Sequence, residues 1–200
     1  MLALLFLNPS LRTLASFQAA MVRLGGGSFV ISPDMSIHGL ETRAGIVMDG
    51  MAAEHIKEAV PVIASYADAL GIRAFAQRRS LEEDIADTRF GELAALADRP
   101  VINMESAINH PCQSLADWKT MDDLGMPKNG GKFVLSWAYH PRPLPLAVPS
   151  ATLHMAAMRG MDVVVHRPAG FELPDAIMQK AQAAATASGG SVTETDDRRE

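Results

Sequence analysis

The feature that most constrains the fold is an apolar run that leads directly into a polar turn near the start of the chain. Residues 2–7 read Leu-Ala-Leu-Leu-Phe-Leu, the composition of a buried strand, and Asn-Pro-Ser-Leu-Arg-Thr follows at 8–13. Where such a strand turns into a helix, the first N–H groups of the helix lack partners within it and lie at the positive end of its dipole. The junction therefore predicts a strand, a turn and a helix, with an anion site at the turn.

The side chains of the turn suit the same chemistry. Ser10 and Thr13 supply hydroxyl donors, and Arg12 supplies a planar set of N–H groups that grips phosphate oxygens in pairs. The alternative is an ordinary helix start in which Ser10 is the N-cap and Arg12 lies in solvent. These six residues alone leave both interpretations open.

Composition limits the class of protein. The chain has 200 residues, 48% of them hydrophobic, which is enough for one domain plus part of another. The net charge of -5 argues against nucleic acid or an anionic membrane as a partner. Cys112 is the only cysteine, which excludes a disulfide within the chain and suits a reducing cytoplasm. No apolar run is long enough to span a bilayer. From the single cysteine we expect a cytoplasmic protein.

The first part of the chain alternates between strand and helix patterns. A helix with Phe17 and Leu24 on one face ends at Gly25-Gly26-Gly27. This alternation predicts a parallel sheet with helices on both faces. The further elements that we expect are a strand at 28–32, a helix at 52–70 that Pro61 kinks or splits, a strand at 71–76, one helix that Ser80 caps and that runs to 96, and a strand at 101–104.

A second α/β unit begins after Gly130-Gly131, which follows a polar stretch. Its expected elements are strands at 132–138, 161–165 and 191–195 and helices at 150–159 and 174–188. A doubly wound domain normally has more strands than this. The expected organisation is therefore one nearly complete α/β domain at residues 1–130 and part of a second at 131–200.

A second motif, His-Pro-Cys-Gln-Ser-Leu-Ala-Asp at 110–117, follows the strand at 101–104 and so lies at the same carboxyl edge as the turn at 8–13. With that turn, it resembles the aspartate and ornithine carbamoyltransferase family. Further stretches are similar to its N-acetylornithine and N-succinylornithine branch. They are Val-Met-Asp-Gly at 47–50, Glu-His-Ile at 54–56, Gly-Ile-Arg-Ala-Phe at 71–75, Val-Ile-Asn-Met-Glu at 101–105 and Trp-Ala-Tyr-His-Pro-Arg-Pro-Leu at 137–144.

The resemblance implies transfer of a carbamoyl group from carbamoyl phosphate to the side-chain amine of an N-acylated ornithine, in arginine biosynthesis. It implies a homotrimer with active sites shared between subunits, and no metal or organic cofactor. The residues that match the family's phosphate-binding positions are Ser10, Leu11 through its N–H, Arg12 and Thr13. Arg73 and His110 match the groups that contact the carbonyl oxygen, Gln113 matches the acceptor for the carbamoyl NH₂, and Glu105 matches a position that holds the acylornithine.

Each assignment has a structural alternative. His110 can be a helix-entry residue satisfied by backbone, Arg73 a surface residue at a strand end, and Glu105 a spare loop carboxylate. Cys112 is interpreted as buried packing, because the reaction needs no acyl-enzyme. The residues interpreted as structural histidines are His55, His154 and His166.

Four positions depart from the family pattern. Leu14 stands where a second arginine usually follows the turn, and His38 where acetylornithine enzymes carry a tryptophan that reaches the carbamoyl phosphate of a neighbouring subunit. Pro145 stands where an asparagine helps to hold the amino acid. Ala53 occupies a position that is Glu in acetyl-specific members and Pro in succinyl-specific ones. Because alanine does not repel a succinyl carboxylate, it favours N-succinylornithine.

The ends of the family pattern are also missing. Family members begin with a further helical segment and contain a His-Cys-Leu-Pro loop, and neither occurs in this sequence. We therefore expect a gene fragment or a degraded relative. The alternative to catalysis is a remnant that only binds carbamoyl phosphate or phosphate. An unrelated nucleotide-binding protein is disfavoured, because the sequence has neither of the usual glycine-rich phosphate loops.

Overall fold

The computed structural model describes residues 1–33, 39–43, 45–141 and 145–197, so the predicted site residue His38 lies outside the described residues. The chain divides into two compact units. The first comprises Met1–Gln77 and Asp87–Ser106, and the second comprises Arg78–Ala86 and Ala107–Glu200. The domain boundary expected at residue 130 stays a prediction, and each compact unit is described by itself.

The first unit contains a four-stranded parallel sheet in the order β2-β1-β5-β6. Its strands are β1 (Leu2–Phe6), β2 (Ser28–Ile31), β5 (Ala69–Arg73) and β6 (Val101–Glu105). From β1 the chain passes outward to β2, whereas β5 pairs with the opposite edge of β1 and leads on to β6. The order in which the chain adds strands therefore reverses between β1 and β5. Ligands of open α/β sheets bind at the carboxyl ends of the two strands where this order reverses.

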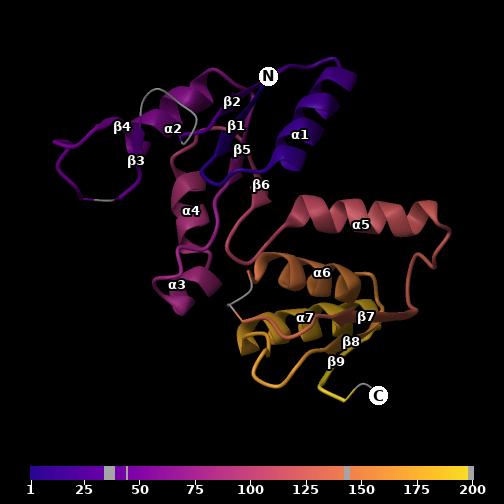
Figure 1. Ribbon diagram of the computed structural model, residues 1–200. Coiled ribbons are helices and arrows are strands. Elements are labelled where there is room, and N and C mark those ends of the chain that lie inside the picture. Colours follow the sequence, from indigo (N-terminus) through magenta and orange to yellow (C-terminus); the bar gives the residue numbers. More distant parts are fainter. Residues whose placement is uncertain (34–38, 44, 142–144, 198–200) are drawn as a thin grey trace. The chain divides into compact units, whose positions relative to one another are not determined.

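Helices cover both faces of this sheet because side chains alternate along β1. Leu2, Leu4 and Phe6 pack with α1 (Leu11–Arg23), whereas Ala3 and Leu5 pack with α2 (Ile56–Ser65) and α4 (Thr88–Ala95). Figure 1 shows α1 on one side of the sheet and α2 and α4 on the other. The predicted fold class, a parallel α/β sheet flanked by helices, is confirmed.

The helix expected at 52–70 is wrong at both ends. Residues Ala52–His55 form β4, which pairs in parallel with β3 (Gly39–Glu41), and α2 begins only after His55. The ring Nδ1 of His55 accepts a hydrogen bond from the Lys57 N–H at 3.2 Å and so caps the helix. Pro61 lies inside α2 without splitting it.

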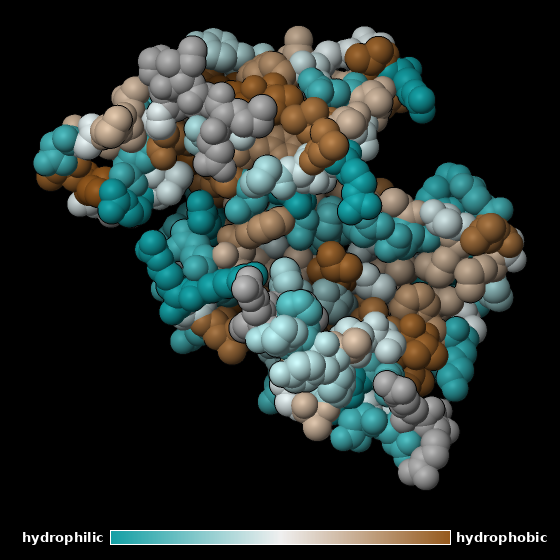
Figure 2. All heavy atoms as spheres, in the orientation of Figure 1, coloured by the Kyte–Doolittle hydropathy of each residue, from teal (hydrophilic) through white to brown (hydrophobic). Residues whose placement is uncertain are grey.

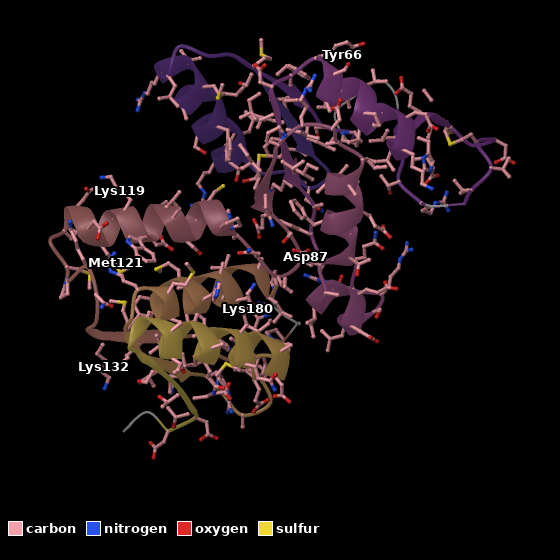
Figure 3. All side chains as sticks on the ribbon, turned by 180° about the vertical axis from the view of Figure 1, so that it is seen from behind. Tyr66, Asp87, Lys119, Met121, Lys132 and Lys180 are labelled. Atoms are coloured by element: carbon pink, nitrogen blue, oxygen red, sulfur yellow. The ribbon has the colours of Figure 1, made fainter. Side chains whose placement is uncertain are left out.

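The single helix expected from Ser80 to residue 96 is two helices, α3 (Leu81–Ile85) and α4. Ser80 does cap α3, since its Oγ accepts from the Glu83 N–H at 3.3 Å. The break lies at Asp87, which has a left-handed φ of 54° and is labelled at the start of α4 in Figure 3. Its carboxylate accepts a hydrogen bond from Ser106 Oγ at 2.5 Å, which helps to hold this uncommon conformation.

The second unit contains a parallel sheet in the order β7-β8-β9. Val163 and Val165 of β8 are buried against the helices that follow β7 and β8. The elements are β7 (Lys132–Ser136), β8 (Asp162–His166), β9 (Ser191–Thr195), α5 (Pro111–Asp123), α6 (Ala147–Met158) and α7 (Asp175–Ser188).

Helix α5 packs on α6 inside this unit. Met121 is buried in the same core as α6, and Figure 3 shows it on the side of α5 towards α6, with Lys119 on the opposite side. The fully buried Arg159 donates to the Pro127 carbonyl at 2.8 and 3.1 Å and pairs with Asp122 at 2.7 Å. These contacts join the end of α6 to the chain around α5. Among the described residues, every helix is too short or too polar to cross a membrane.

Candidate functional site

The turn after β1 begins α1 with a well-formed cap. Ser10 has extended backbone angles, and its Oγ accepts from the Thr13 N–H at 3.3 Å and donates to Thr13 Oγ1 at 2.9 Å. Ser10 is therefore the N-cap, as one of the two interpretations proposed. An N-cap uses one of the helix's initial N–H groups and leaves others for a ligand, so the cap is compatible with an anion site.

Arg12 and Leu11 both lie at the surface on the first turn of α1. Because the exposed Leu11 side chain is aliphatic and has no hydrogen-bond donor, the only group that Leu11 offers to an anion is its backbone N–H. Figure 2 shows apolar atoms at the surface in the part of the first unit where Figure 1 places α1. The exposed large apolar residues of α1 and its C-cap are Leu11, Val22 and Leu24.

The end of β5 is tied directly to this turn. The Leu7 N–H donates to the Arg73 carbonyl at 3.0 Å, and the Phe75 N–H donates to Asn8 Oδ1 at 2.7 Å. The acceptor of the second bond is the side chain of Asn8, which lies two residues before Ser10. Arg73 and the Ser10–Thr13 turn therefore lie at the carboxyl ends of two neighbouring strands, β5 and β1, between which the strand order reverses.

Arg73 is buried and paired with Glu105. Its Nη1 donates to Glu105 Oε2, and the two side chains are only 8% and 10% exposed. The register explains the contact: Ile72 pairs with Asn103 but Arg73 pairs with Glu105, so Met104 is an extra residue in β6. This bulge places Glu105 opposite Arg73, and bulges are frequent next to active sites. The alternative that Arg73 is a surface residue is wrong, because its side chain is buried.

Two further features define the surroundings of Arg73. Its guanidinium carbon lies 4.6 Å from the centroid of the Phe75 ring, in the range of a cation–π contact. Its Nε is buried and has no hydrogen-bond partner among the described residues. A buried N–H without a partner costs about 1–3 kcal/mol, and a ligand oxygen would satisfy it.

His110 and Gln113 belong to the second unit. His110 stands at the N-cap position of α5 and is half-buried, and Gln113 lies one turn further along the helix. The Gln113 Nε2 donates to Asp117 Oδ1 at 2.8 Å. Because this bond fixes the amide, Oε1 of Gln113 stays available as an acceptor, which is the property that its predicted role requires.

The remaining positions discussed from the sequence differ in how far they are buried. Ala53 lies exposed on β4, and Pro145 is exposed just before α6. Leu14 packs against the core under α1, where an arginine would not fit without losing that contact. Burial raises the pKa of the Cys112 thiol, which agrees with a packing role because it lowers the thiolate fraction.

Two of the histidines interpreted as structural make structural contacts. His55 caps α2 through Nδ1, and its Nε2 lies 2.8 Å from the Arg43 carbonyl. His166 Nδ1 lies 3.1 Å from Ser136 Oγ across β7 and β8. The pKa of His154 is lowered by desolvation and by the nearby charge of Lys180.

Three residues near the site were not singled out from the sequence. Asn8 directly precedes the Pro-Ser pair of the turn, Phe75 follows Arg73 by two positions, and Asp117 follows Gln113 by four. In a helix, the four-residue spacing puts Asp117 on the same face as Gln113. In the strand expected at 71–76, the two-residue spacing puts Phe75 on the same face as Arg73, although β5 ends at Arg73. The same-face spacing is the signal that could have found Phe75 and Asp117.

The fold and these contacts define an α/β protein with a parallel sheet. A polar turn that carries an arginine lies at the place where the strand order of this sheet reverses. Residues 1–123 match the family model described as the carbamoyl-P binding domain of aspartate/ornithine carbamoyltransferase. The chain belongs to the aspartate/ornithine carbamoyltransferase family, and the family resemblance of its motifs is confirmed.

Two relatives of this chain belong to the branch of the family that acts on acylated ornithines. The chain is 39% identical over 199 residues to N-acetylornithine carbamoyltransferase of Xanthomonas campestris, covering 98% of this chain and 58% of that protein. It is 38% identical over 172 residues to N-succinylornithine carbamoyltransferase of Bacteroides thetaiotaomicron, covering 86% of this chain and 54% of that protein. The chain thus spans little more than half the length of these relatives.

The chain is also similar to solved structures of acetylornithine transcarbamylases. One is a glutamate-to-alanine mutant of N-acetyl-L-ornithine transcarbamylase complexed with carbamyl phosphate and N-succinyl-L-norvaline. It has a TM-score of 0.88 and 39% identity, covering 98% of this chain and 60% of that chain. An acetylornithine transcarbamylase complexed with acetylcitrulline has a TM-score of 0.88 and 38% identity, covering 98% of this chain and 59% of that one.

Proposed function

We propose that this chain supplies the carbamoyl phosphate site of an enzyme that carbamoylates the side-chain amine of an N-acylated ornithine. The observation that carries the proposal is the pairing of the Ser10–Thr13 turn with Arg73 on adjacent strand ends. Phosphate needs donors from a helix N-terminus and a cation, and the turn offers both. The two relatives described above are named N-acetylornithine carbamoyltransferase and N-succinylornithine carbamoyltransferase.

The phosphate end of the donor binds at the turn in this proposal. The N–H groups at the start of α1, the hydroxyls of Ser10 and Thr13 and the guanidinium of Arg12 hold the phosphate oxygens. As the amine attacks the carbamoyl carbon, the C–O bond to phosphate breaks, and phosphate leaves with the electron pair and takes up the proton that the amine loses. Donors already in place at the phosphate stabilise this departing charge.

The carbonyl end of the donor binds at Arg73 and His110. Negative charge develops on the carbonyl oxygen as the new C–N bond forms, so donors there lower the barrier. Gln113 accepts from the carbamoyl NH₂ through Oε1. Removal of one donor to such an oxygen typically costs roughly 10²–10³ in rate. No metal or organic cofactor takes part in this scheme.

We assign Ala53 and Glu105 to the acceptor side. Ala53 carries no charge to repel a succinyl carboxylate, and a solved glutamate-to-alanine mutant of a relative is complexed with N-succinyl-L-norvaline. N-succinylornithine is therefore the favoured acceptor. In this role Glu105 holds the acylornithine while it keeps Arg73 in place, because a carboxylate accepts more than one hydrogen bond. The wider context of the proposal is arginine biosynthesis in the cytoplasm by a homotrimer with shared active sites.

The test is an assay of phosphate release from carbamoyl phosphate with N-acetylornithine and N-succinylornithine, for this chain and for a version extended to the length of its relatives. We expect acceptor-dependent release by the extended version, faster with N-succinylornithine. An extended protein that binds carbamoyl phosphate but turns over neither acceptor would instead support a protein that only binds it.

A further inference from the structure

The anion turn and Arg73 are joined by a side chain that the predicted site does not include. Asn8 Oδ1 accepts the Phe75 N–H at 2.7 Å, and 67 residues separate the two in sequence. Phe75 lies two residues beyond the last residue of β5, Arg73. The bond therefore pins the segment after β5 to the residue just before the turn.

Phe75 in turn contacts the Arg73 guanidinium, at 4.6 Å from its ring centroid. The guanidinium is thus held on two sides, by the Phe75 ring and by the Glu105 carboxylate. The Glu105 side is fixed by backbone bonds, since the Ala74 N–H donates to the Glu105 carbonyl at 2.9 Å. On the Phe75 side, the Asn8 side chain ties the segment to the turn.

We propose that Asn8 is a positioning residue that sets the distance between the anion turn and the Arg73 guanidinium. The proposal rests on the proposed function, in which the turn holds the phosphate and Arg73 contacts the carbonyl oxygen of one ligand. Both ends of such a ligand are held only if the two groups keep a fixed separation, and small misplacement of one group weakens the whole contact.

The chemistry of Asn8 suits this role. A neutral amide oxygen accepts the Phe75 N–H without adding negative charge next to an anion site, whereas a carboxylate would repel the phosphate. Loss of the acceptor leaves a partly buried N–H without its bond and frees the segment that carries Phe75. Arg73 then keeps Glu105 but loses the ring that holds its other side.

Two probes separate positioning from binding. Inorganic phosphate contacts the turn alone, whereas phosphonoacetamide carries a phosphonate and a carbonyl group and so engages Arg73 as well. In the wild-type chain we expect phosphonoacetamide to bind about tenfold more tightly than phosphate, the usual gain from a hydrogen bond to a charged group. In Asn8→Ala we expect this ratio to fall to about one, with phosphate affinity unchanged.

The control is Asn129→Ala, an exposed asparagine of the second unit, which keeps the wild-type ratio. Hydrogen exchange gives a second readout: the Phe75 amide loses protection in Asn8→Ala and keeps it in Asn8→Asp, which retains an acceptor oxygen. An Asn8→Ala chain that keeps the wild-type ratio, or that weakens both probes equally, overturns the positioning role. Wild-type chain that binds neither probe contradicts the proposed function itself, which is a distinguishable result.

Discussion

The guanidinium of Arg73 and the carboxylate of Glu105 form a buried ion pair across the carboxyl ends of β5 and β6. The pair exists because the bulge at Met104 shifts β6 by one residue and brings Glu105 opposite Arg73. A buried charge keeps its position only when a partner and hydrogen bonds compensate for its lost hydration. Glu105 thus fixes the charge that the proposed reaction uses at the carbonyl oxygen.

Replacement of Glu105 by Gln removes this compensation while keeping the size of the side chain. Because Arg73 remains charged and buried, we expect the free energy of unfolding to fall by about 3 kcal/mol. Urea denaturation measures the change. Glu58→Gln, an exposed glutamate of the same unit, is the matched control and changes stability by about 0.5 kcal/mol or less. Equal stability of the two variants would contradict the compensating role.

Asp117 is expected to act through Gln113. Asp117→Ala frees the Gln113 amide to rotate, so we expect kcat/KM of the extended enzyme to fall by about two- to tenfold, the value of one solvent-exposed hydrogen bond. Asp117→Asn keeps an acceptor oxygen and restores most of the activity. The matched control is Asp123→Ala on the exposed side of the same helix. Loss of activity in the control but not at Asp117 would argue against the assignment.

Arg159 is the main polar contact between the end of α6 and the chain around α5. Its side chain is fully buried, lies over the Trp118 ring at 5.3 Å and donates to backbone carbonyls. We expect Arg159→Met to lower the free energy of unfolding by about 2–3 kcal/mol, since Asp122 is partly exposed and regains water.

Arg159→Lys tests the geometry of the same contact. It keeps the charge but loses the planar set of donors, so we expect an intermediate loss of stability. Arg23→Met, at the exposed end of α1, controls for the loss of an arginine. Guanidinium denaturation followed by circular dichroism compares the three variants. If Arg159→Met matched the Arg23 control, the contact would not stabilise the unit.

Glu41 gives the first unit a pH dependence. Hydrogen bonds from the Arg43 guanidinium and backbone N–H lower the pKa of Glu41 from 4.5 to about 2. Because the folded pKa is depressed, this stabilisation is complete above pH 4.5 and is lost as the pH falls through 2. We expect Glu41→Gln to lower Tm near neutral pH, and the difference from wild type to shrink towards pH 2. A difference that grows on acidification would refute the assignment.

Much of the fold was predictable from local patterns. The fully apolar β1, the helix ended by Gly25-Gly26-Gly27 and the strands before and after α7 all lie within a residue or two of the expected ranges. The failures depend on contacts distant in sequence. Residues 52–55 become a strand through pairing with β3, and Asp87 breaks a helix through a bond with Ser106. Local propensity does not contain these pairings.

The site was predictable to the level of its motifs. The turn at Ser10–Thr13 and the strand-end Arg73 were expected from residue types and the family resemblance. What connects them was not expected, because the Asn8–Phe75 bond and the bulge opposite Arg73 depend on the register of three strands. A single-residue shift of register changes which side chains meet, and sequence patterns do not specify register to that accuracy.

The central claim is that the turn after β1 binds the phosphate of carbamoyl phosphate. Calorimetric titration of this chain with carbamoyl phosphate at low temperature tests it most directly, beside Arg12→Ala and the exposed-arginine control Arg23→Ala. The account predicts saturable binding to wild type and to the control, competition by inorganic phosphate, and a loss of at least about tenfold in affinity for Arg12→Ala. Equal affinity of wild type and Arg12→Ala, or no binding to wild type, would contradict it.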